Sequence, residues 1–270
     1  MRASTLYRDD TPIEEYLLKN RRVYVKREDL FGCPPAPPLG KLRGLRVVLE
    51  DLFHDGVQLV GCWDTRVSRL GEGLAAACRE FHSMRAIVSY PTRKGTDTPA
   101  PVAAAKLLGA DVLPLRGNHV SICYAQAKRH VENNGGRMLP FGLECESAVA
   151  GVAREAARTP AELACGTVVL CCGSGVTLAG LLIGLPVTPR RLIGLSSGRS
   201  LTKILATVRR YVAVVSPPVQ LLPAVMPYGA TPTLRCPFPT HPNYDLKAWQ
   251  FLVDNIDHLE EPVLFWNIGA

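Results

Sequence analysis

Residues 167–186 read TVVLCCGSGVTLAGLLIGLP, and the rest of the sequence is organised around them. The apolar run at 168–172 is long enough for one buried strand, and an apolar helix is expected over 177–185. Between them lies the turn Gly173-Ser174-Gly175. A glycine-rich turn between a buried strand and a helix presents backbone N–H groups and the positive helix end to an anion. We therefore predict that the phosphate of a cofactor binds at this turn.

The composition is typical of a globular protein. The chain has 270 residues, of which 47% are hydrophobic and 20% charged, enough for one large domain or two of ordinary size. Charges throughout the first thirty residues argue against a secretory signal. Residues 167–189 are uncharged and long enough to cross a bilayer, but the glycines and the serine near their centre favour a strand, a turn and a helix. We therefore expect a cytoplasmic protein without a membrane span.

The nine cysteines show neither CxxC pairs nor the Cys/His spacing of a zinc site. Cys171 and Cys172 are adjacent in the strand predicted over 168–172, so their side chains should point to opposite faces. We interpret the cysteines as reduced residues of the core, and we expect no metal ion.

The net charge of +7 is confined to one part of the chain. Residues 163–244 contain seven Lys or Arg and no Asp or Glu, whereas the remaining residues carry 24 charges of each sign. Such a one-sided field favours an anionic partner, either a phosphorylated cofactor or a nucleic acid. A solvated basic surface without a specific partner is the alternative, and charge alone does not decide between them.

Predicted strands and helices alternate along the chain. A loop with four prolines at 31–39 leads to Lys41, which stands at the start of a helix expected over 42–53. Further strands are expected at 22–29, 57–62, 85–90, 110–115, 137–141, 191–195 and 262–266, and further helices at 68–81, 100–108, 120–133, 146–158, 201–211 and 245–255. This alternation predicts an α/β fold with parallel sheets covered on both faces. The proline-rich residues 217–242 are expected to form a loop.

Two nucleotide-binding motifs fail at the glycine turn. The dinucleotide fingerprint GxGxxG would need a third glycine where Leu178 stands, and no acid follows the strand expected at 191–195. A Walker loop would need a lysine after its last glycine, but Leu181 follows Gly180. The turn therefore predicts a phosphate site of another kind.

Five motifs spread over nearly the whole chain follow one another in a characteristic order. They are KREDL at 26–30, GKLR at 40–43, VGCWDTRVSR at 60–69, GSGVT at 173–177, and PNYD at 242–245 with the closing VLFWNIG at 263–269. Together they resemble the fold-type II pyridoxal-phosphate enzymes, most closely the 1-aminocyclopropane-1-carboxylate deaminase and D-cysteine desulfhydrase group. The resemblance implies two αβα domains with mostly parallel sheets, similar to the tryptophan synthase beta fold. We expect a larger cofactor domain of residues 1–48 and 144–270, a smaller α/β domain of residues 49–143, and a homodimer.

The resemblance also implies a role for each matching residue. Lys41 would carry pyridoxal phosphate as a Schiff base and later shuttle a proton, and Asp245 would pair with the ring nitrogen. Tyr228 and Tyr244 match tyrosines that can act as acids or bases, with packing in the core as the alternative reading. The phosphate would be held by Gly173, Ser174, Gly175, Val176 and Thr177.

The chain departs from the family at two places. Gly40 stands where the family has asparagine before its lysine. Asp64, Thr65 and Arg66 replace a QSN segment that supports the substrate carboxylate in the deaminases. We expect these three residues to contact a different substrate, with Thr65 keeping a catalytic hydroxyl. The cofactor site is thus predicted to be intact and the substrate pocket rebuilt.

The altered pocket and the basic span 163–244 suggest an amino-acid group carried by a larger anionic substrate. Similar pyridoxal-phosphate enzymes of bacteriophages decarboxylate an amino acid appended to thymidine in DNA. We therefore predict a lyase of this kind that also contacts DNA, in the host cytoplasm if a phage encodes the chain. Two alternatives stay open: a deaminase or desulfhydrase of a free small amino acid, and a cofactor-free binding protein on the same scaffold.

Overall fold

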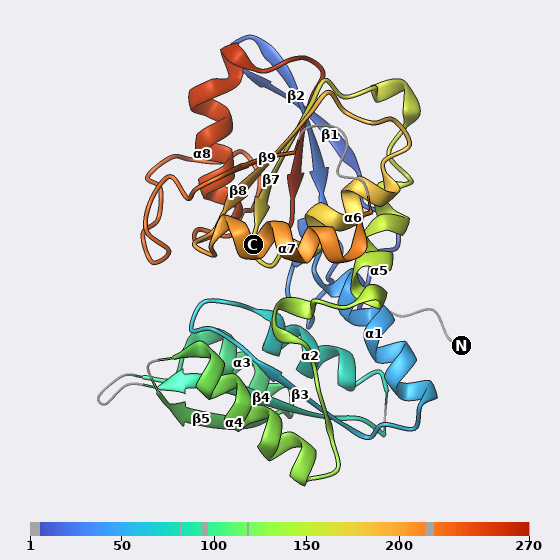
Figure 1. Cartoon of the computed structure of the whole chain (residues 1–270), viewed down its shortest axis with the longest axis vertical. Coiled ribbons are helices and arrows are strands. Elements are labelled where there is room, and N and C mark those ends of the chain that lie inside the picture. Colours follow the sequence, from blue (N-terminus) through green and yellow to red (C-terminus); the bar gives the residue numbers. More distant parts are fainter. Residues whose placement is uncertain (1–5, 82, 93–96, 118, 214–218, 270) are drawn as a thin grey trace. The chain divides into compact units, whose positions relative to one another are not determined.

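The computed structural model describes residues 6–81, 83–92, 97–117, 119–213 and 219–269. The chain divides into two compact units, each built around its own sheet (Figure 1). The first unit comprises Met1–Tyr7, Gly32–Pro37 and Leu45–Leu143. The second unit comprises Arg8–Phe31, Pro38–Gly44 and Glu144–Ala270.

The second unit contains a six-stranded sheet in the order β1-β2-β10-β7-β8-β9. Its strands are β1 (Ile13–Leu18), β2 (Arg21–Arg27), β10 (Val263–Asn267), β7 (Thr167–Cys172), β8 (Arg191–Ser196) and β9 (Val219–Leu222). Its helices are α5 (Glu146–Ala156), α6 (Val176–Gly184), α7 (Leu201–Tyr211) and α8 (Asp245–Asn255), with short 3-10 turns at Glu28–Leu30, Ala161–Leu163 and Ile256–His258. All neighbouring strands are parallel except β1, which pairs antiparallel with β2.

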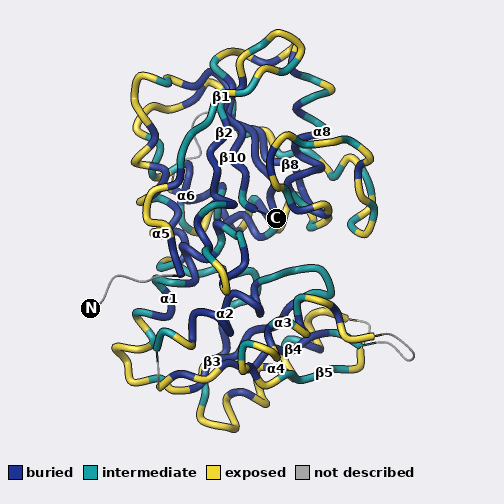
Figure 2. The backbone as a smooth tube through the Cα atoms, turned by 180° about the vertical axis from the view of Figure 1, so that it is seen from behind, coloured by how far each residue is buried: buried dark blue, intermediate teal, exposed yellow. Residues whose placement is uncertain are grey.

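Burial follows from the position of each strand in this sheet. The central strands β7 and β10 are buried along their whole length, whereas the edge strand β1 is only partly buried (Figure 2). Alternate residues of β7, β8 and β10 pack with α8 in one cluster that includes Phe265 and Trp249, because successive side chains of a strand point to opposite faces. Helices α5 and α6 approach closely at two glycines, since a Cβ on Gly180 or Gly184 would collide with Val152 or Ala153.

The first unit contains a four-stranded parallel sheet in the order β5-β4-β3-β6. Its strands are β3 (Leu59–Trp63), β4 (Arg85–Thr92), β5 (Asp111–Arg116) and β6 (Arg137–Met138). The helices are α2 (Leu70–Cys78), α3 (Ala100–Leu107) and α4 (Val120–Asn133), with a 3-10 turn at Phe141–Leu143, and α1 (Leu42–His54) contributes its residues from Leu45 onward. Side chains of β3, β4 and α4 form the core cluster of this unit.

The α/β class with mostly parallel sheets is confirmed, and three details of the prediction are wrong. The strand β1 was not predicted, because its sequence IEEYLL carries two charges and does not alternate cleanly. The loop expected over 217–242 contains β9, which the flanking prolines conceal and which adds to the sheet edge beside β8. The strand expected over 137–141 ends at Met138 and gives way to the turn at Phe141–Leu143. Among the described residues no helix combines the length and apolar character needed to cross a membrane.

Candidate functional site

The carboxyl ends of β2, β10, β7 and β8 meet at one edge of the second unit's sheet, because these strands are parallel. Ligands of open α/β sheets bind outside this edge. The predicted turn at 173–177 leaves the sheet here after β7, and the residues that follow β10 leave it beside β7. Lys41 and Asp245 are both connected to the residues after β10.

The turn between β7 and α6 has the geometry of an anion site. Gly175 has φ +101° and precedes Val176, the first residue of α6, where its positive φ favours glycine. A Cβ on Gly175 would also lie 3.0 Å from the carbonyl oxygen of Ile204. At Gly173, by contrast, a Cβ would meet only Ser197 Oγ, at 3.9 Å, so there is open space at the turn. The N-cap residue of α6 is Gly175, which has no side chain to accept from the first N–H groups of the helix.

The peptide of Ile268 connects the segment of Lys41 to Asp245. The N–H of Gly40 donates to the carbonyl oxygen of Ile268 at 2.6 Å, and Leu39 forms a bridge with Gly269. The N–H of Ile268 donates to Asp245 Oδ1 at 3.1 Å. Lys41 and Asp245 are therefore held on two sides of one short segment.

The glycine before Lys41 is required by close packing. A Cβ on Gly40 would lie 2.5 Å from Glu28 Cβ and 3.2 Å from the carbonyl oxygen of Ile268. The asparagine of the related family does not fit here without movement of Glu28. The first departure noted in the sequence thus has a local structural cause.

Asp245 is a buried carboxyl group with a raised pKa. Burial raises its pKa to about 7, and hydrogen bonds from the backbone of Ile268 and Gly269 oppose this rise. Asp245 is only 2% exposed. A cationic N–H donor beside Asp245 would stabilise the ionised form and lower the pKa again.

The pKa of the Cys171 thiol, near the end of β7, depends on the charged groups around it. Burial raises the pKa of Cys171, the Asp245 carboxylate adds to the rise, and the ammonium groups of Lys41 and Lys247 oppose it. Three predicted features of the second unit, Lys41, Asp245 and the glycine turn after β7, are thus brought to the same strand end.

Tyr228 and Tyr244 meet beside Asp245. Their hydroxyl oxygens are 2.6 Å apart and their rings are 5.8 Å apart at 74°. The loop that carries Tyr228 is fixed by Lys247, whose Nζ donates to the carbonyl oxygens of Pro227 at 2.7 Å and Tyr228 at 3.0 Å. Asn243 Nδ2 donates to the same Tyr228 oxygen at 3.0 Å. Asn243 belongs to the PNYD motif, which gave it no role, and Lys247 lies two residues after that motif.

A buried ion cluster holds the segment that leads to Lys41. Arg43 donates to Glu28 Oε2 at 2.6 Å, contacts Glu155 at 3.1 Å and lies 4.1 Å above the ring of Phe31. Lys26 also pairs with Glu155, and neither side chain is more than 3% exposed. The KREDL and GKLR motifs therefore support the site through this cluster, a role that only the contact with the distant Glu155 reveals.

The predicted substrate segment 64–66 belongs to the first unit, at the carboxyl end of β3. Asp64 is 3% exposed, and its Oδ1 accepts from the N–H of Thr65 at 3.0 Å while Oδ2 accepts from the N–H of Gly71 at 2.7 Å. Thr65 Oγ1 accepts from the N–H of Ser68 at 3.1 Å. Arg66 donates to the carbonyl oxygen of Asp97 at 2.9 Å. The structure thus places these side chains in the turn itself, and their contacts with a substrate stay a prediction.

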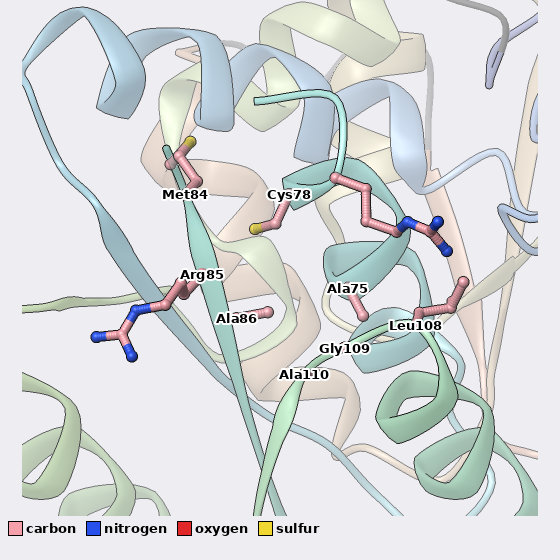
Figure 3. A pocket seen from close by; sticks show the side chains of 9 residues that line it. Ala75, Cys78, Met84, Arg85, Ala86, Leu108, Gly109 and Ala110 are labelled. Carbon is pink, nitrogen blue, oxygen red and sulfur yellow. The ribbon is translucent and has the colours of Figure 1, made fainter. Parts of the chain in front are cut away.

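The first unit also contains a cavity of about 390 Å³ at the amino ends of β4 and β5 (Figure 3). Burial raises the pKa of its Cys78 thiol to about 12, so this cysteine is a poor nucleophile at neutral pH. The residues that line the cavity include Ala75, Cys78, Met84, Arg85, Ala86 and Leu108. None of the predicted site residues lines it.

No family model matches the chain. A curated relative from Pseudomonas phage M6, described as a glycyl-dTMP PLP-dependent decarboxylase, is 30% identical over 278 aligned positions that cover 97% of this chain and 99% of the relative. Among solved structures, a homologue of ACC deaminase is similar with a TM-score of 0.82 and 22% identity, covering 98% of this chain and 90% of that one. A hydrogen sulfide-producing enzyme of Fusobacterium nucleatum has a TM-score of 0.66 and 13% identity, covering 97% and 93%.

Proposed function

The chain belongs to the family of pyridoxal-phosphate-dependent decarboxylases that the phage M6 enzyme represents, and we propose that it decarboxylates an amino acid carried by a thymidine nucleotide. The full-length similarity to that relative is the observation that carries the proposal. The geometry of the second unit supports it, since an open glycine turn, Lys41 and Asp245 all lie at the end of β7.

The residues at this edge fit pyridoxal phosphate. The open space at Gly173 leaves room for a phosphate on the N–H groups of 173–177, and Lys41 is the amine for the aldehyde. Asp245 offers a buried carboxylate to the ring nitrogen, whose N–H would supply the partner that its pKa of about 7 calls for. When bound, the cofactor supplies an electron sink.

The reaction breaks the bond between the α-carbon and the carboxyl carbon. Carbon dioxide leaves, and a proton takes its place on the α-carbon. We assign movement of that proton to Lys41 and the Tyr228–Tyr244 pair, whose hydroxyl groups share one hydrogen bond. The catalytic role of Thr65 and the substrate contacts of Asp64 and Arg66 are parts of the same proposal.

The absorbance spectrum of the purified protein tests the cofactor, and mass spectrometry of an oligonucleotide with glycyl-modified thymidine tests the reaction. Wild-type protein should absorb as a lysine-bound pyridoxal phosphate and remove the mass of carbon dioxide. Lys41→Ala should lose the lysine-linked absorbance and at least about 10²-fold in rate, the lower value for a proton-transfer group. A colourless protein that borohydride does not modify at Lys41 would instead support a cofactor-free binding protein. Ammonia or sulfide release from free amino acids would support a deaminase or desulfhydrase.

We further propose that the thymidine lies in DNA and that the basic span 163–244 contacts the phosphates. Lys203 and Arg209 are exposed on α7, whereas Glu144 pairs with Arg199 and lies 3.8 Å from Arg210. The exposed pair is therefore the better candidate for phosphate contacts.

Salt-dependent binding of unmodified duplex DNA tests this surface. Lys203→Glu with Arg209→Glu should lower the slope of log affinity against log salt by roughly 2, since each phosphate contact contributes about 0.9. Arg129→Glu, an exposed change on α4 outside the span, is the control and should leave the slope unchanged. Equal slopes for all three proteins would contradict DNA binding by α7. The proposed homodimer is tested by light scattering, and the proposed host-cytoplasm location by fractionation of infected cells.

A further inference from the structure

Two buried carboxyl groups are bound by consecutive residues at the end of β10. Asn267 is the last residue of this strand, and its side-chain Nδ2 donates to Asp29 Oδ1 at 2.8 Å. The N–H of the next residue, Ile268, donates to Asp245 Oδ1 at 3.1 Å. Asp29 is 1% exposed and Asp245 is 2% exposed, so bulk water screens the interaction between them only weakly. The two carboxyl groups therefore act on each other within the core of the second unit.

Asp29 is held in place from two sides. Arg27 at the end of β2, the strand beside β10, donates through Nε to Asp29 Oδ1 at 2.9 Å and through Nη2 to Oδ2 at 2.7 Å (Figure 2). A buried carboxylate is tolerated when it is paired and hydrogen-bonded in this way. Asn267 Nδ2 also donates to the carbonyl oxygen of Pro239 at 2.9 Å, which fixes the amide that contacts Asp29. Asp29 thus presents a fixed negative charge beside residues 267–269.

We propose that Asp29 is a positioning residue for the cofactor site, a second carboxylate that reinforces the hold of Asp245 on a protonated ring nitrogen. The inference rests on the proposed function, in which Asp245 faces that nitrogen. Asp29 acts through Asn267, whose amide joins it to the segment that binds Asp245, and through its charge. A proton shared between Asp245 and a neighbouring base is released less readily when a second negative charge lies close by.

Asp29 is the carboxylate that acts on Asp245. Burial raises the pKa of Asp245 to about 7, and the charge of Asp29 adds to this rise. Other titratable groups of this region include the thiols of Cys171, Cys172 and Cys236, the amines of Lys41 and Lys247, and the rings of Tyr244 and His241. Burial raises the pKa values of the three thiols well above neutral, so these thiols add no negative charge at neutral pH.

Titration of Asp245 in the cofactor-free protein tests the coupling without any catalysis. Carbon NMR of protein labelled at the aspartate carboxyl groups follows the titration, and the Asp245 signal is the one that Asp245→Asn removes. Asp29→Asn keeps the shape and an oxygen for the Asn267 amide, and it should lower the titration midpoint of Asp245 by about one pH unit. Glu14→Gln is the matched control and should leave the midpoint unchanged, because Glu14 pairs with the same Arg27 but is 37% exposed on β1. An unchanged midpoint in Asp29→Asn, or an equal shift in Glu14→Gln, would overturn the inference.

A paired replacement serves if Asp29→Asn does not fold. Arg27→Gln with Asp29→Asn replaces the ion pair by two amides, so neither partner is left as an uncompensated buried charge. This double variant should also lower the midpoint of Asp245, because the negative charge that acts on Asp245 is that of Asp29. A midpoint equal to that of wild type would refute the role of Asp29.

Nitrogen NMR of bound pyridoxal phosphate, labelled at the ring nitrogen, tests the role on the cofactor-loaded protein. The chemical shift of the ring nitrogen reports its proton, which Asp29→Asn should lose at a pH about one unit lower than wild type. Loss at the same pH in both proteins would refute the role of Asp29 at the cofactor. A protein that binds no pyridoxal phosphate would refute the proposed function, and the titration of the cofactor-free protein would still decide whether Asp29 acts on Asp245.

Discussion

The turns after β7 and β3 are built alike but receive their negative charge from different sources. Each follows a fully buried parallel strand and passes into a short helix. After β7 the chain continues with Gly173, and the space beside this residue is open. After β3 it continues with Asp64, whose carboxylate bonds the N–H groups of its own turn.

The difference between the turns shows what makes such a turn a binding site. Strand and helix provide N–H donors in both units, and the residue directly after the strand decides whether these donors serve the fold or a ligand. At Gly173 the donors are open to the cofactor phosphate that we propose there, whereas after β3 the Asp64 carboxylate uses them within the fold. The comparison therefore predicts that substitutions in the turn after β7 change mainly the affinity for a ligand. Substitutions in the turn after β3 should change mainly the free energy of unfolding.

The largest effect is expected from pH, acting on Asp245 in the cofactor-free protein. Burial raises the folded-state pKa of Asp245 from 3.8 to about 7. The folded state therefore favours the protonated form, so this contribution is complete below pH 3.8 and is lost as pH rises through about 7. The loss amounts to up to about 4 kcal/mol, since one pKa unit corresponds to about 1.4 kcal/mol. Urea unfolding of wild type and Asp245→Asn at pH 5 and pH 8 captures the part of this loss between pH 5 and about 7, about 3 kcal/mol.

The cofactor should abolish much of this pH dependence, because the ring N–H stabilises the ionised carboxylate. The same unfolding measurement with bound pyridoxal phosphate is the control. If wild type and Asp245→Asn lose equal stability between pH 5 and pH 8, Asp245 is not the titrating group.

The next largest effect is expected from removing the Asp64 carboxylate from the turn after β3. Asp64→Ala removes two hydrogen bonds to a buried charge, which should lower the free energy of unfolding by about 3 kcal/mol. Thr65→Val removes one neutral hydrogen bond in the same turn and should cost about 1 kcal/mol. Denaturant titration of the cofactor-free proteins measures both. A loss below 1 kcal/mol for Asp64→Ala would mean that water serves the turn as well as the carboxylate.

A smaller effect is expected from Gly175→Ala in the open turn. Its φ of +101° costs an L-residue about 1–2 kcal/mol, and the added Cβ would lie 3.0 Å from the carbonyl oxygen of Ile204. Relaxation of this strain moves the N–H groups, so the affinity for pyridoxal phosphate should fall about tenfold or more. Titration of the cofactor-free protein, followed by absorbance, measures the affinity. Unchanged affinity would show that the phosphate does not depend on this backbone conformation.

The smallest effect on stability is expected from Gly173→Ala, where the new methyl group meets only Ser197 Oγ at 3.9 Å. The cofactor-free protein should change by less than about 0.5 kcal/mol in unfolding free energy. The methyl group nevertheless enters the space proposed for the phosphate, so cofactor affinity should fall while stability does not. Equal loss of both quantities would place Gly173 in the packing of the fold and not in the site.

The sequence predicts the turn after β7 more completely than the turn after β3. A buried strand, two glycines and an apolar helix are visible in residues 167–186, and the structure has the turn where they indicate it. Asp64 is visible as a residue type, but the return of its carboxylate to the N–H groups of Thr65 and Gly71 is a three-dimensional feature. It has no pattern in the sequence, because backbone donors are the same at every residue.

The link between Lys41 and Asp245 is also invisible in the sequence. It runs through the N–H and carbonyl groups of Ile268, a residue whose side chain plays no part in it. Resemblance to a family suggested the pairing, whereas periodicity and charge could not. The residues of the ion cluster around Arg43 belong to two sequence motifs, but its partner Glu155 lies far along the chain, in a helix to which the sequence gave no role.

The ion cluster of Lys26, Glu28, Arg43 and Glu155 sets an order of events during protein synthesis. Glu155 is 129 positions after Lys26, so the ribosome completes the cluster long after it has made the segment of Lys41. Until then Lys26 and Arg43 lack a carboxylate that the finished core requires, since a buried cation without its partner is strongly destabilising. Lys41, which we propose as the reactive lysine, should therefore reach its final position only once translation has passed Glu155. The proposed capture of the cofactor aldehyde by Lys41 should accordingly occur late in assembly, and chains truncated before Glu155 should not retain the cofactor.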